Sequence, residues 1–377
     1  MHIVYLTNEF PEINKNHGGI GTFIDILSQH LVENNINVSV LGVSSAKSFE
    51  TITDKGIRLI NIQQSNWPFG KFIQNSIRIN KALLNLSSKV QIDIIEGSEL
   101  SFAFISTKIK CKRVIRMHGG HHFFAYTTGK KTAFWRSFQE KRSFKKANYL
   151  IAVSNYVGET SKRLLKFNKE YSIIYNFVNN SIFKPKSDAV KKDHTICFVG
   201  TICKKKGVKE LIEAFKLTIQ EIPDATLHII GRDWIDDEYG SYTSYVKTAI
   251  PDQLSKSIHF YGAVDYHKLP EIIASMSVCV YPSHSESFGL TLVEAIAMNK
   301  TIIASDIAPF KEIIELNHSW IFINPFDAKN FSNTLIHLLK NENLATALAQ
   351  EINHTVMNKF DLNKLVNQNI EFYKSIL

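Results

Sequence analysis

The segment from Pro282 to Met298 holds two glutamates at a spacing suited to binding a polar ligand. It follows an apolar, β-branched run that predicts a strand, and its second half has the apolar spacing of a helix that begins near Phe288. Glu286 would then lie in the loop after the strand, with Glu294 about one and a half turns inside the helix. A carboxylate at Glu294 can accept both hydroxyls of a ribose. Taken alone, however, the pair also fits an ordinary strand–turn–helix with Glu294 in solvent.

The start of the same helix is a candidate anion site. Backbone N–H groups in the first turn of a helix have no intrahelical acceptor, and they stabilise negative charge. Here these groups belong to Phe288, Gly289 and Leu290. Glycine at position 289 permits close approach of a ligand to the backbone.

Three consecutive lysines follow another predicted strand. The chain runs Phe198-Val-Gly-Thr-Ile-Cys-Lys-Lys-Lys-Gly207 and then enters a helix, so Lys204, Lys205 and Lys206 lie beyond the carboxyl end of the strand. Lysines at this place can neutralise a diphosphate, although such a cluster taken alone is more often a solvated surface. The loop is not a P-loop, because the Gly-x4-Gly-Lys-Ser/Thr pattern is absent.

The first part of the chain offers two further candidates. Gly19 and Gly21 lie in His17-Gly-Gly-Ile-Gly-Thr-Phe23, which opens a helix but lacks the third glycine of a dinucleotide fingerprint, so we interpret it as an anion-binding turn. His118 follows Val114-Ile-Arg-Met117, a predicted strand, and so lies at the edge of a predicted sheet. A lone histidine there is more often a hydrogen-bonded core residue than a catalytic one.

The elements that must position these residues alternate between short apolar runs and amphipathic segments. The predicted strands are His2–Leu6, Asn37–Leu41, Ile57–Ile62, Ile92–Ile95, Arg113–Met117, Tyr149–Val153, Thr195–Val199, Thr226–Ile230, Ile258–Tyr261, Val278–Tyr281, Thr301–Ala304 and Trp320–Ile323. Such alternation is typical of parallel sheets with helices on both faces, and this many strands fit two domains better than one. A polar stretch, 176–192, marks the break. Ligands of such sheets bind beyond the carboxyl ends of the strands, so we expect the site in a cleft between the domains.

Composition narrows the class of protein further. The 377 residues are 44% apolar and 21% charged, which fits a globular protein and excludes a disordered or collagenous one. Lys and Arg outnumber Asp and Glu by nine, which favours anionic partners. The four cysteines form no Cys-x-x-Cys pair, so we expect core thiols in a reducing compartment. The N-terminus predicts a strand rather than a signal peptide, and no run approaches the ~18 apolar residues of a membrane span. We therefore expect a cytoplasmic location, at most on a membrane face.

Together and in this order, the four elements resemble the family-4 retaining glycosyltransferases of GT-B fold. The resemblance covers essentially the whole chain, and its most specific part is Glu286-Ser-Phe-Gly-Leu-x-x-x-Glu-Ala295. It includes Ile151-Ala-Val-Ser154, Tyr175-Asn-Phe-Val178 and Phe183-Lys-Pro185. The resemblance implies an α/β architecture of two Rossmann-like, doubly wound parallel-sheet domains facing across a cleft. Residues 1–178 would form the acceptor domain and 179–359 the nucleotide-sugar donor domain, with a helix at about 360–377 packing back on the first.

The resemblance also assigns roles to residues. As catalytic residues, Lys206 would hold the donor diphosphate, Glu286 would contact the sugar, and His118 would lie beside the transferred sugar. The donor-binding residues would be Gly19, Gly21, Thr201, Lys205, Phe288, Gly289, Leu290 and Glu294. No metal and no other cofactor is expected.

Three positions depart from the family pattern. An arginine usually follows the loop glycine, where this chain has Thr201, and either Lys204 or Lys205 is a candidate for the missing charge. A glycine usual after the second glutamate's helix is replaced by Asn299-Lys300, and a Gly-Gly pair by Ala308-Pro309-Phe310.

The leading hypothesis is therefore a retaining, metal-independent glycosyltransferase. It would move a sugar from a nucleotide-diphosphate sugar to a glycan, lipid-linked or other hydroxyl acceptor, in surface polysaccharide or glycoconjugate synthesis. The alternatives are a sugar-nucleotide epimerase or a phosphorylase on the same fold, and a basic nucleic-acid-binding protein. No RNA-binding signature supports the last, so we expect no nucleic-acid partner.

A further hypothesis concerns a membrane surface as partner. Basic residues crowd the segment 108–146, in which Glu140 is the only acidic residue, and Thr132–Ala147 has helical spacing. Phe134, Phe138 and Phe144 lie in this helix. Either the helix packs its aromatic side chains inward, or it forms a peripheral face for the inner membrane, near a membrane-borne acceptor.

Overall fold

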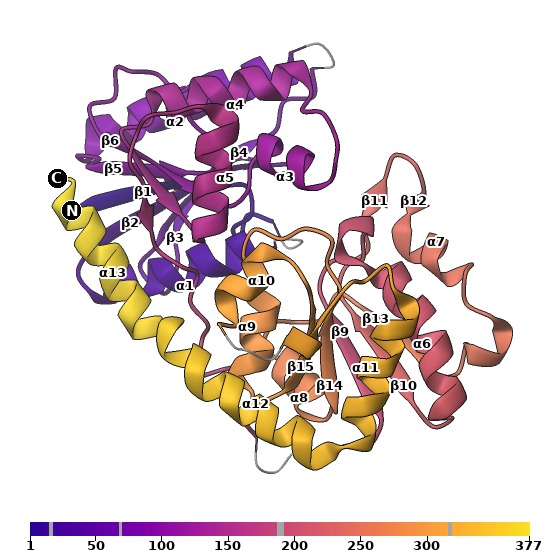
Figure 1. Ribbon diagram of the computed structural model, residues 1–377. Coiled ribbons are helices and arrows are strands. Elements are labelled where there is room, and N and C mark those ends of the chain that lie inside the picture. Colours follow the sequence, from indigo (N-terminus) through magenta and orange to yellow (C-terminus); the bar gives the residue numbers. More distant parts are fainter. Residues whose placement is uncertain (15–17, 68–69, 187–191, 316–318) are drawn as a thin grey trace. The chain divides into compact units, whose positions relative to one another are not determined.

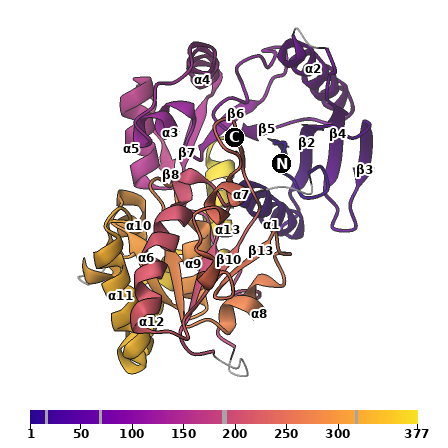
Figure 2. The same cartoon turned by 90° about the vertical axis from the view of Figure 1, so that its right-hand side faces the viewer.

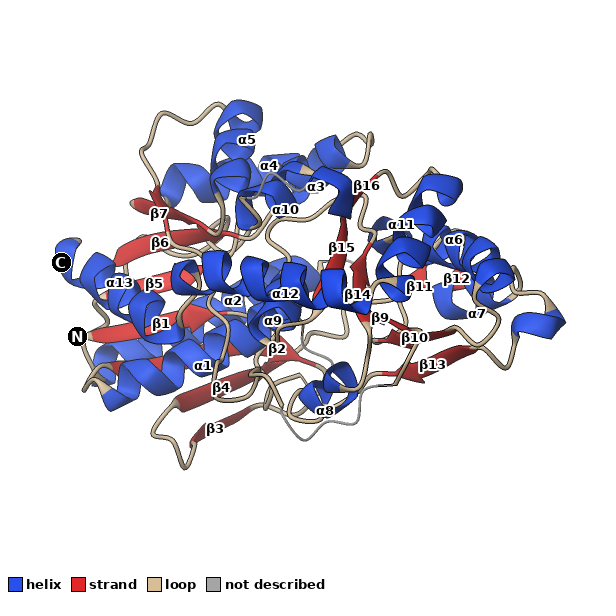
Figure 3. Ribbon diagram, turned by 60° about the horizontal axis from the view of Figure 1, so that its bottom comes forward, coloured by secondary structure: helices blue, strands red, loops and turns tan. Residues whose placement is uncertain are grey.

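The structure is a computed structural model that describes residues 1–14, 18–67, 70–186, 192–315 and 319–377. The chain divides into two compact units, one of Met1–Phe177 with Asn363–Leu377 and the other of Val178–Leu362 (Figure 1). Each unit is built on its own sheet, with helices connecting the strands (Figure 3).

The sheet of the first unit has the order β3-β4-β2-β1-β5-β6-β7-β8, and only β3 pairs antiparallel with its neighbour. Its strands are β1 His2–Leu6, β2 Asn37–Ser44, β3 Phe49–Ile52, β4 Arg58–Gln63, β5 Ile94–Gly97, β6 Lys112–Met117, β7 Tyr149–Ala152 and β8 Ser172–Ile173. Its helices are α1 Gly19–Glu33, α2 Lys71–Lys89, α3 His121–Thr127, α4 Phe134–Lys146, α5 Asn155–Leu165 and α13 Leu362–Ser375.

The second unit repeats the arrangement, with a six-stranded parallel sheet of order β13-β10-β9-β14-β15-β16. Its strands are β9 Thr195–Val199, β10 Thr226–Ile230, β13 Ile258–Gly262, β14 Val278–Tyr281, β15 Thr301–Ser305 and β16 Phe322–Ile323, and a separate hairpin joins β11 Ile235–Asp236 to β12 Gly240–Ser241. Its α-helices are α6 Val208–Glu221, α7 Tyr242–Lys247, α8 Leu269–Ala274, α9 Leu290–Ala297, α10 Ala308–Ile313, α11 Ala328–Lys340 and α12 Glu342–Val356.

The strands predicted from the sequence are all present, and β1, β9, β10 and β14 have the predicted bounds. Central parallel strands are buried on both faces and therefore appear as continuous apolar runs. The last predicted strand, Trp320–Ile323, was too long, because residues 319–321 form a 3₁₀ turn before β16. The sequence did not predict β3, which is exposed along its length, or the two-residue strands β8, β11 and β12.

Helix α13 is fastened to the first sheet by a buried polar network. The guanidinium of Arg116 in β6 donates to the carboxylate of Glu96 at 2.7 Å and to the side chain of Asn369 in α13 at 2.5 Å. The hydroxyl of Tyr373 donates to Glu96 at 2.7 Å and lies 3.0 Å from the hydroxyl of Tyr5. Removing Glu96 or Arg116 would leave the other buried charge without its ionic partner, so the network fixes the last helix on this sheet.

Candidate functional site

The strand order of the second unit identifies where a ligand should bind. The chain moves outward from β9 through β10 to β13, then returns to the other side of β9 at β14. At such a switch point, the loops after the two central strands diverge and leave room for a ligand. The loop after β9 carries the three lysines, and the loop after β14 carries Glu286.

A glycine joins these two loops. Lys204–Lys206 form one turn of 3₁₀ helix that ends at Gly207, where φ is +69°. A Cβ on Gly207 would overlap the carbonyl oxygen of Pro282, which begins the second loop. The N–H of His284 also donates to the carbonyl of Lys205 at 2.8 Å. The backbone therefore holds the lysines against the glutamate loop.

Within this junction, Lys206 and Glu286 form an ion pair between the ammonium and Oε1. Both side chains are largely shielded, with 19% and 11% of their surfaces exposed. Ser283 donates its hydroxyl to the same carboxylate oxygen at 2.9 Å. The structure thus brings together two of the three predicted catalytic residues, and the charge of each balances the other.

The neighbouring lysines have different surroundings. Lys204 is exposed, lies 3.9 Å from the carboxylate of Glu238 and sits over the ring of Tyr239. Burial lowers the pKa of Lys205, an effect that the nearby negative charge of Glu286 opposes. Of the two candidates for the charge missing at half-buried Thr201, Lys205 is therefore the one within electrostatic reach of Glu286.

The helix after Glu286 begins later than predicted. Gly289, with φ of +109°, is the N-cap, and α9 begins at Leu290 rather than near Phe288. Phe288 lies outside the helix with its side chain buried, and its ring packs against Phe360 with centroids 5.4 Å apart. A residue with a Cβ at position 289 would be strained by its φ and would overlap the ring of Phe310.

Glu294 lies in α9 and is buried, so the alternative prediction, which placed it on a solvated face of the helix, is wrong. Burial raises the pKa of Glu294 to about 8, and a hydrogen bond from the Tyr266 hydroxyl partly opposes this rise. Tyr266 and His284 were not singled out from the sequence. The ring of His284 lies 3.3 Å from the carboxylate of Glu210 in α6, so this histidine anchors the glutamate loop to a second helix.

The other candidates lie in the first unit. His118 follows β6 and is buried, its backbone N–H donates to Glu99 at 2.6 Å, and burial lowers its pKa to about 3. The imidazole is thus neutral at physiological pH. Gly19 opens α1 and Gly21 is buried in it, while the N–H of the N-cap Gly18 donates to Glu9 at 3.2 Å. A carboxylate of the chain itself therefore contacts the proposed anion-binding turn; His17 lies outside the described residues.

Two buried glutamates support the His118 loop, and sequence analysis missed their role. Glu140 in α4 accepts from the backbone N–H of His122 at 3.1 Å and lies 2.5 Å from the Nδ1 of that residue. Burial raises the pKa of Glu99 to about 8 and that of Glu140 to about 7. Gly120 lies against both side chains, and a Cβ there would overlap the Glu140 carboxylate. One feature of the sequence indicated that Glu140 is buried. It is a single acidic residue among basic ones, and it lies four positions before the apolar Phe144, which places both on the same face of a helix.

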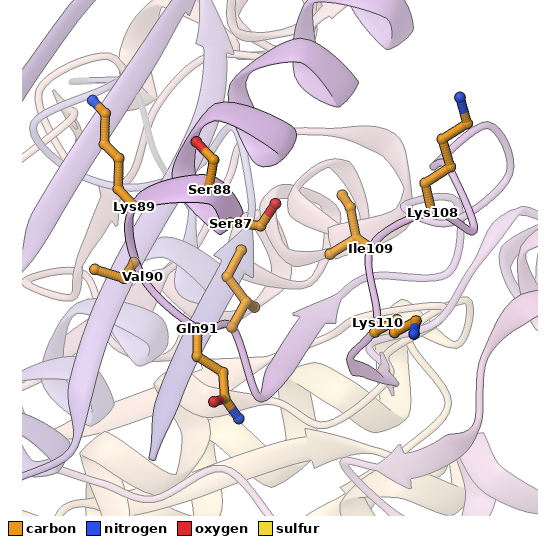
Figure 4. A pocket seen from close by; sticks show the side chains of 9 residues that line it. Ser87, Ser88, Lys89, Val90, Gln91, Lys108, Ile109 and Lys110 are labelled. Carbon is orange, nitrogen blue, oxygen red and sulfur yellow. The ribbon is translucent and has the colours of Figure 1, made fainter.

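A surface pocket of about 410 Å³ lies away from these residues (Figure 4). It is lined by residues 87–92, which run from the end of α2 toward β5, and by residues 108–110, which precede β6. These segments lie at the amino ends of the parallel strands, the edge opposite to the one at which ligands of such sheets bind. The pocket is therefore not part of the candidate site.

The described ranges also bear on metal and thiol chemistry. No group of three or more His, Cys, Asp or Glu side chains gathers there as a metal site. The four cysteines are free, and three are buried, as expected of core thiols. In the same part of the chain, none of the helices is both long and apolar enough to cross a bilayer.

Comparison with known proteins agrees with this geometry. Residues 17–181 match the model "Glycosyltransferase Family 4", and residues 179–355 match "Glycosyl transferases group 1". An uncharacterized glycosyltransferase of Methanocaldococcus jannaschii is 24% identical over 95% of this chain and 94% of its own. The O-antigen chain mannosyltransferase of Salmonella typhimurium is 26% identical over 59% of each chain. The Anabaena protein HepE, solved in complex with UDP and glucose, superimposes with a TM-score of 0.79 and 15% identity over both full chains.

The two matched models together span residues 17–355, and the likeness to solved structures over the full chain shows the GT-B fold. The chain belongs to the group 1, family-4-type glycosyltransferases.

Proposed function

We propose that the protein transfers a sugar, with retention of anomeric configuration, from a nucleotide-diphosphate sugar to a hydroxyl of a glycan or lipid-linked acceptor. The observation that carries the proposal is the Lys206–Glu286 pair at the switch point of the second sheet, next to the start of α9. Similarity to an O-antigen chain mannosyltransferase supports a glycan acceptor and a role in surface polysaccharide synthesis.

The lysine loop would bind the donor diphosphate. An entering diphosphate replaces Glu286 as the anionic partner of Lys206, and the α9 N-terminus and Lys205 add positive potential. Glu286, once released, can accept hydrogen bonds from the hydroxyls of the sugar. Glu294 would accept the ribose hydroxyls, which requires that the carboxylate exchange Tyr266 for the ligand.

The bond changes follow from this charge distribution. The acceptor oxygen forms a bond to the anomeric carbon on the face from which the diphosphate departs, and the bond between that carbon and the diphosphate oxygen breaks. The departing diphosphate takes the proton of the acceptor hydroxyl. Preorganised positive charge lowers the barrier because negative charge develops on the leaving group. In this proposal, the protein's own lysines supply that charge without a metal ion, so turnover should persist in EDTA.

His118 remains a prediction as the residue beside the transferred sugar. Its neutral imidazole could accept or donate one hydrogen bond to a sugar hydroxyl, and it would not act as a cationic acid near neutral pH. We further propose that the enzyme works in the cytoplasm, at the inner membrane face if its acceptor is lipid-linked.

A donor screen tests the proposal. The protein is incubated with UDP-, GDP- and ADP-sugars in the presence of oligosaccharide acceptors, and the products are separated and identified by NMR. We expect one nucleoside diphosphate to be released together with an α-configured product from an α-configured donor. An epimerised nucleotide sugar would instead identify an epimerase. Release of a sugar 1-phosphate in a parallel incubation with an oligosaccharide and inorganic phosphate would identify a phosphorylase. The matching nucleoside diphosphate should also raise the melting temperature. At a hundredfold excess over Kd, its binding adds about 2.7 kcal/mol to the free energy of unfolding.

A further inference from the structure

Large apolar side chains protrude from α2 and α4 of the first unit. Phe134 at the start of α4 is 87% exposed, and Trp135 and Phe138 in the same helix are about half exposed. In α2, Ile73 and Ile77 are 58% and 62% exposed. Exposed single apolar residues are ordinary on protein surfaces, but a contiguous group of this size marks an interaction site.

Aromatic rings connect the two helices that carry these side chains. Phe72 in the first turn of α2 meets Trp135 of α4 edge-on, with ring centroids 6.2 Å apart. Trp135 also stacks on Phe138 at 5.5 Å and on Phe104 at 6.0 Å. Both helices lie along the same end of the first unit in two perpendicular views (Figures 1 and 2). We call this surface the aromatic–basic face.

The charge of the aromatic–basic face has one sign. Helix α2 contains no Asp or Glu, and its four basic residues are exposed. In residues 121–147 the only acidic residue is Glu140, which is buried beneath His122. The exposed basic residues are Lys71, Arg78, Lys81, Lys89, Lys130, Lys131, Arg136, Lys141, Arg142 and Lys145.

Helix α4 does pack part of its surface inward. Phe144, Gln139 and Glu140 are buried, so the helix has an ordinary core-facing side. Arg142 and Lys146 donate at 2.7 Å to the backbone carbonyls of Ala103 and Ile105, which attaches the helix to the unit. Helix α4 therefore has its own contacts with the core, and the exposure of Phe134 and Trp135 is not explained by a lack of such contacts.

We propose that the aromatic–basic face docks on the surface of an anionic phospholipid bilayer. Aromatic side chains, Trp above all, are favoured at the boundary between acyl chains and headgroups, where one end is apolar and the other is wet. Lysines and arginines beside them attract the anionic headgroups, and the two contributions together give reversible attachment. This attachment goes beyond the proposed reaction and does not depend on it, since it involves only residues of the first unit outside the candidate site.

Sedimentation with vesicles tests the proposal. The full-length protein is mixed with vesicles of phosphatidylcholine alone or of phosphatidylcholine with phosphatidylglycerol, at low and high salt. We expect cosedimentation with the anionic vesicles at low salt, weakened by salt. Phe134→Ser should reduce the partition coefficient roughly tenfold, because the side chain can no longer be buried. Since Phe134 is 87% exposed, its replacement should not alter the melting temperature.

A matched pair of variants separates the aromatic–basic face from net charge. One variant replaces Lys130, Lys131, Arg136 and Lys141 by Gln, and its control replaces four other exposed lysines, Lys256, Lys268, Lys329 and Lys374, by Gln. Each removed charge in the first set should weaken binding by roughly fivefold at low salt. The control set should have little effect. Ile235→Ser, at a 73% exposed position of the second unit, is the corresponding control for Phe134.

Four outcomes would overturn the proposal. The first is absence of the wild-type protein from the vesicle pellet at low salt, and the second is an equal loss of vesicle binding in the two fourfold variants. The third is tight, salt-sensitive binding to an oligonucleotide without binding to vesicles. The fourth is a dimer in solution that the substitution Phe134→Ser dissociates. The last two would identify a nucleic acid or a second copy of the chain as the occupant. Release of nucleoside diphosphate from a soluble donor is measured on the same samples, so loss of the proposed reaction is seen separately from loss of attachment.

Discussion

One carboxylate near the candidate site of the second unit and two near His118 of the first unit are held in different ways. In the second unit, Glu286 is paired with the ammonium of Lys206 and with a serine hydroxyl. In the first unit, Glu99 and Glu140 are buried and held mainly by backbone N–H groups of the turn that follows His118. An ion pair can be opened by a competing anion, whereas carboxylates beneath a turn can be released only by moving the backbone. The comparison indicates an exchangeable binding site in one unit and a fixed support in the other.

The largest expected effect concerns the exchangeable pair. Lys206→Ala should lower kcat by about 10²–10³-fold, because one preorganised charge facing the leaving group has this value. The matched control is Lys209→Ala, at the second residue of α6, where the ammonium lies 3.2 Å from the hydroxyl of Tyr245. Steady-state kinetics with the donor found in the screen provide the measurement. Normal turnover of Lys206→Ala would remove the diphosphate role from this loop.

The two glutamates of the second unit should separate turnover from binding. Glu286→Gln removes the charge that neutralises Lys206, so the nucleoside diphosphate should bind as tightly as before or more tightly while kcat falls. Glu294→Ala should weaken the nucleoside diphosphate and the donor alike, by about 1–3 kcal/mol if hydrogen bonds to ribose are lost. Calorimetric titration with the nucleoside diphosphate, combined with kinetics, measures both. Equal and small effects of the two substitutions would indicate that both glutamates are structural only.

The fixed support should appear in the pH dependence of stability. The folded protein holds the proton of Glu99 up to about pH 8 and that of Glu140 up to about pH 7, whereas the unfolded chain loses both near the ordinary pKa of 4.5. Between these values the folded state binds more protons, so the free energy of unfolding should fall as pH rises through this interval. Glu99→Gln should flatten that dependence. Urea denaturation across the interval measures it, and an unchanged slope in the variant would contradict the assignment.

The smallest effect is expected for Lys204→Ala. This substitution tests whether Lys204 or Lys205 replaces the arginine that the family pattern has at position 201. Lys204 is exposed and pairs with Glu238 and Tyr239, so its loss should change KM for the donor by less than about twofold. Lys205→Ala should raise KM several-fold more, because Glu286 lies within electrostatic reach of its ammonium. If the order of the two effects is reversed, Lys204 supplies the charge.

The sequence by itself determined the alternation of strands and helices and the loops in which the lysines and Glu286 lie. It could do so because buried parallel strands such as Val278–Tyr281 are unbroken apolar runs, and because glycines mark the turns that need unusual backbone angles. Periodicity also predicted a helix over residues 132–147, which the structure has at 134–146 with Phe144 buried.

Only the tertiary structure decided which loops meet. Residues 206 and 286 are eighty positions apart, and nothing in either segment specifies that β9 and β14 are neighbours. The same is true of Glu294, whose burial depends on the packing of α9, and of Glu99 and Glu140, which come together under one turn from separate elements. The exposure of Phe134 and Ile77 also depends on the tertiary structure. Both side chains are apolar, which favours burial, but the fold leaves them exposed. Local sequence sets the periodicity of each element, whereas burial and pairing depend on which neighbours the whole chain brings to that element.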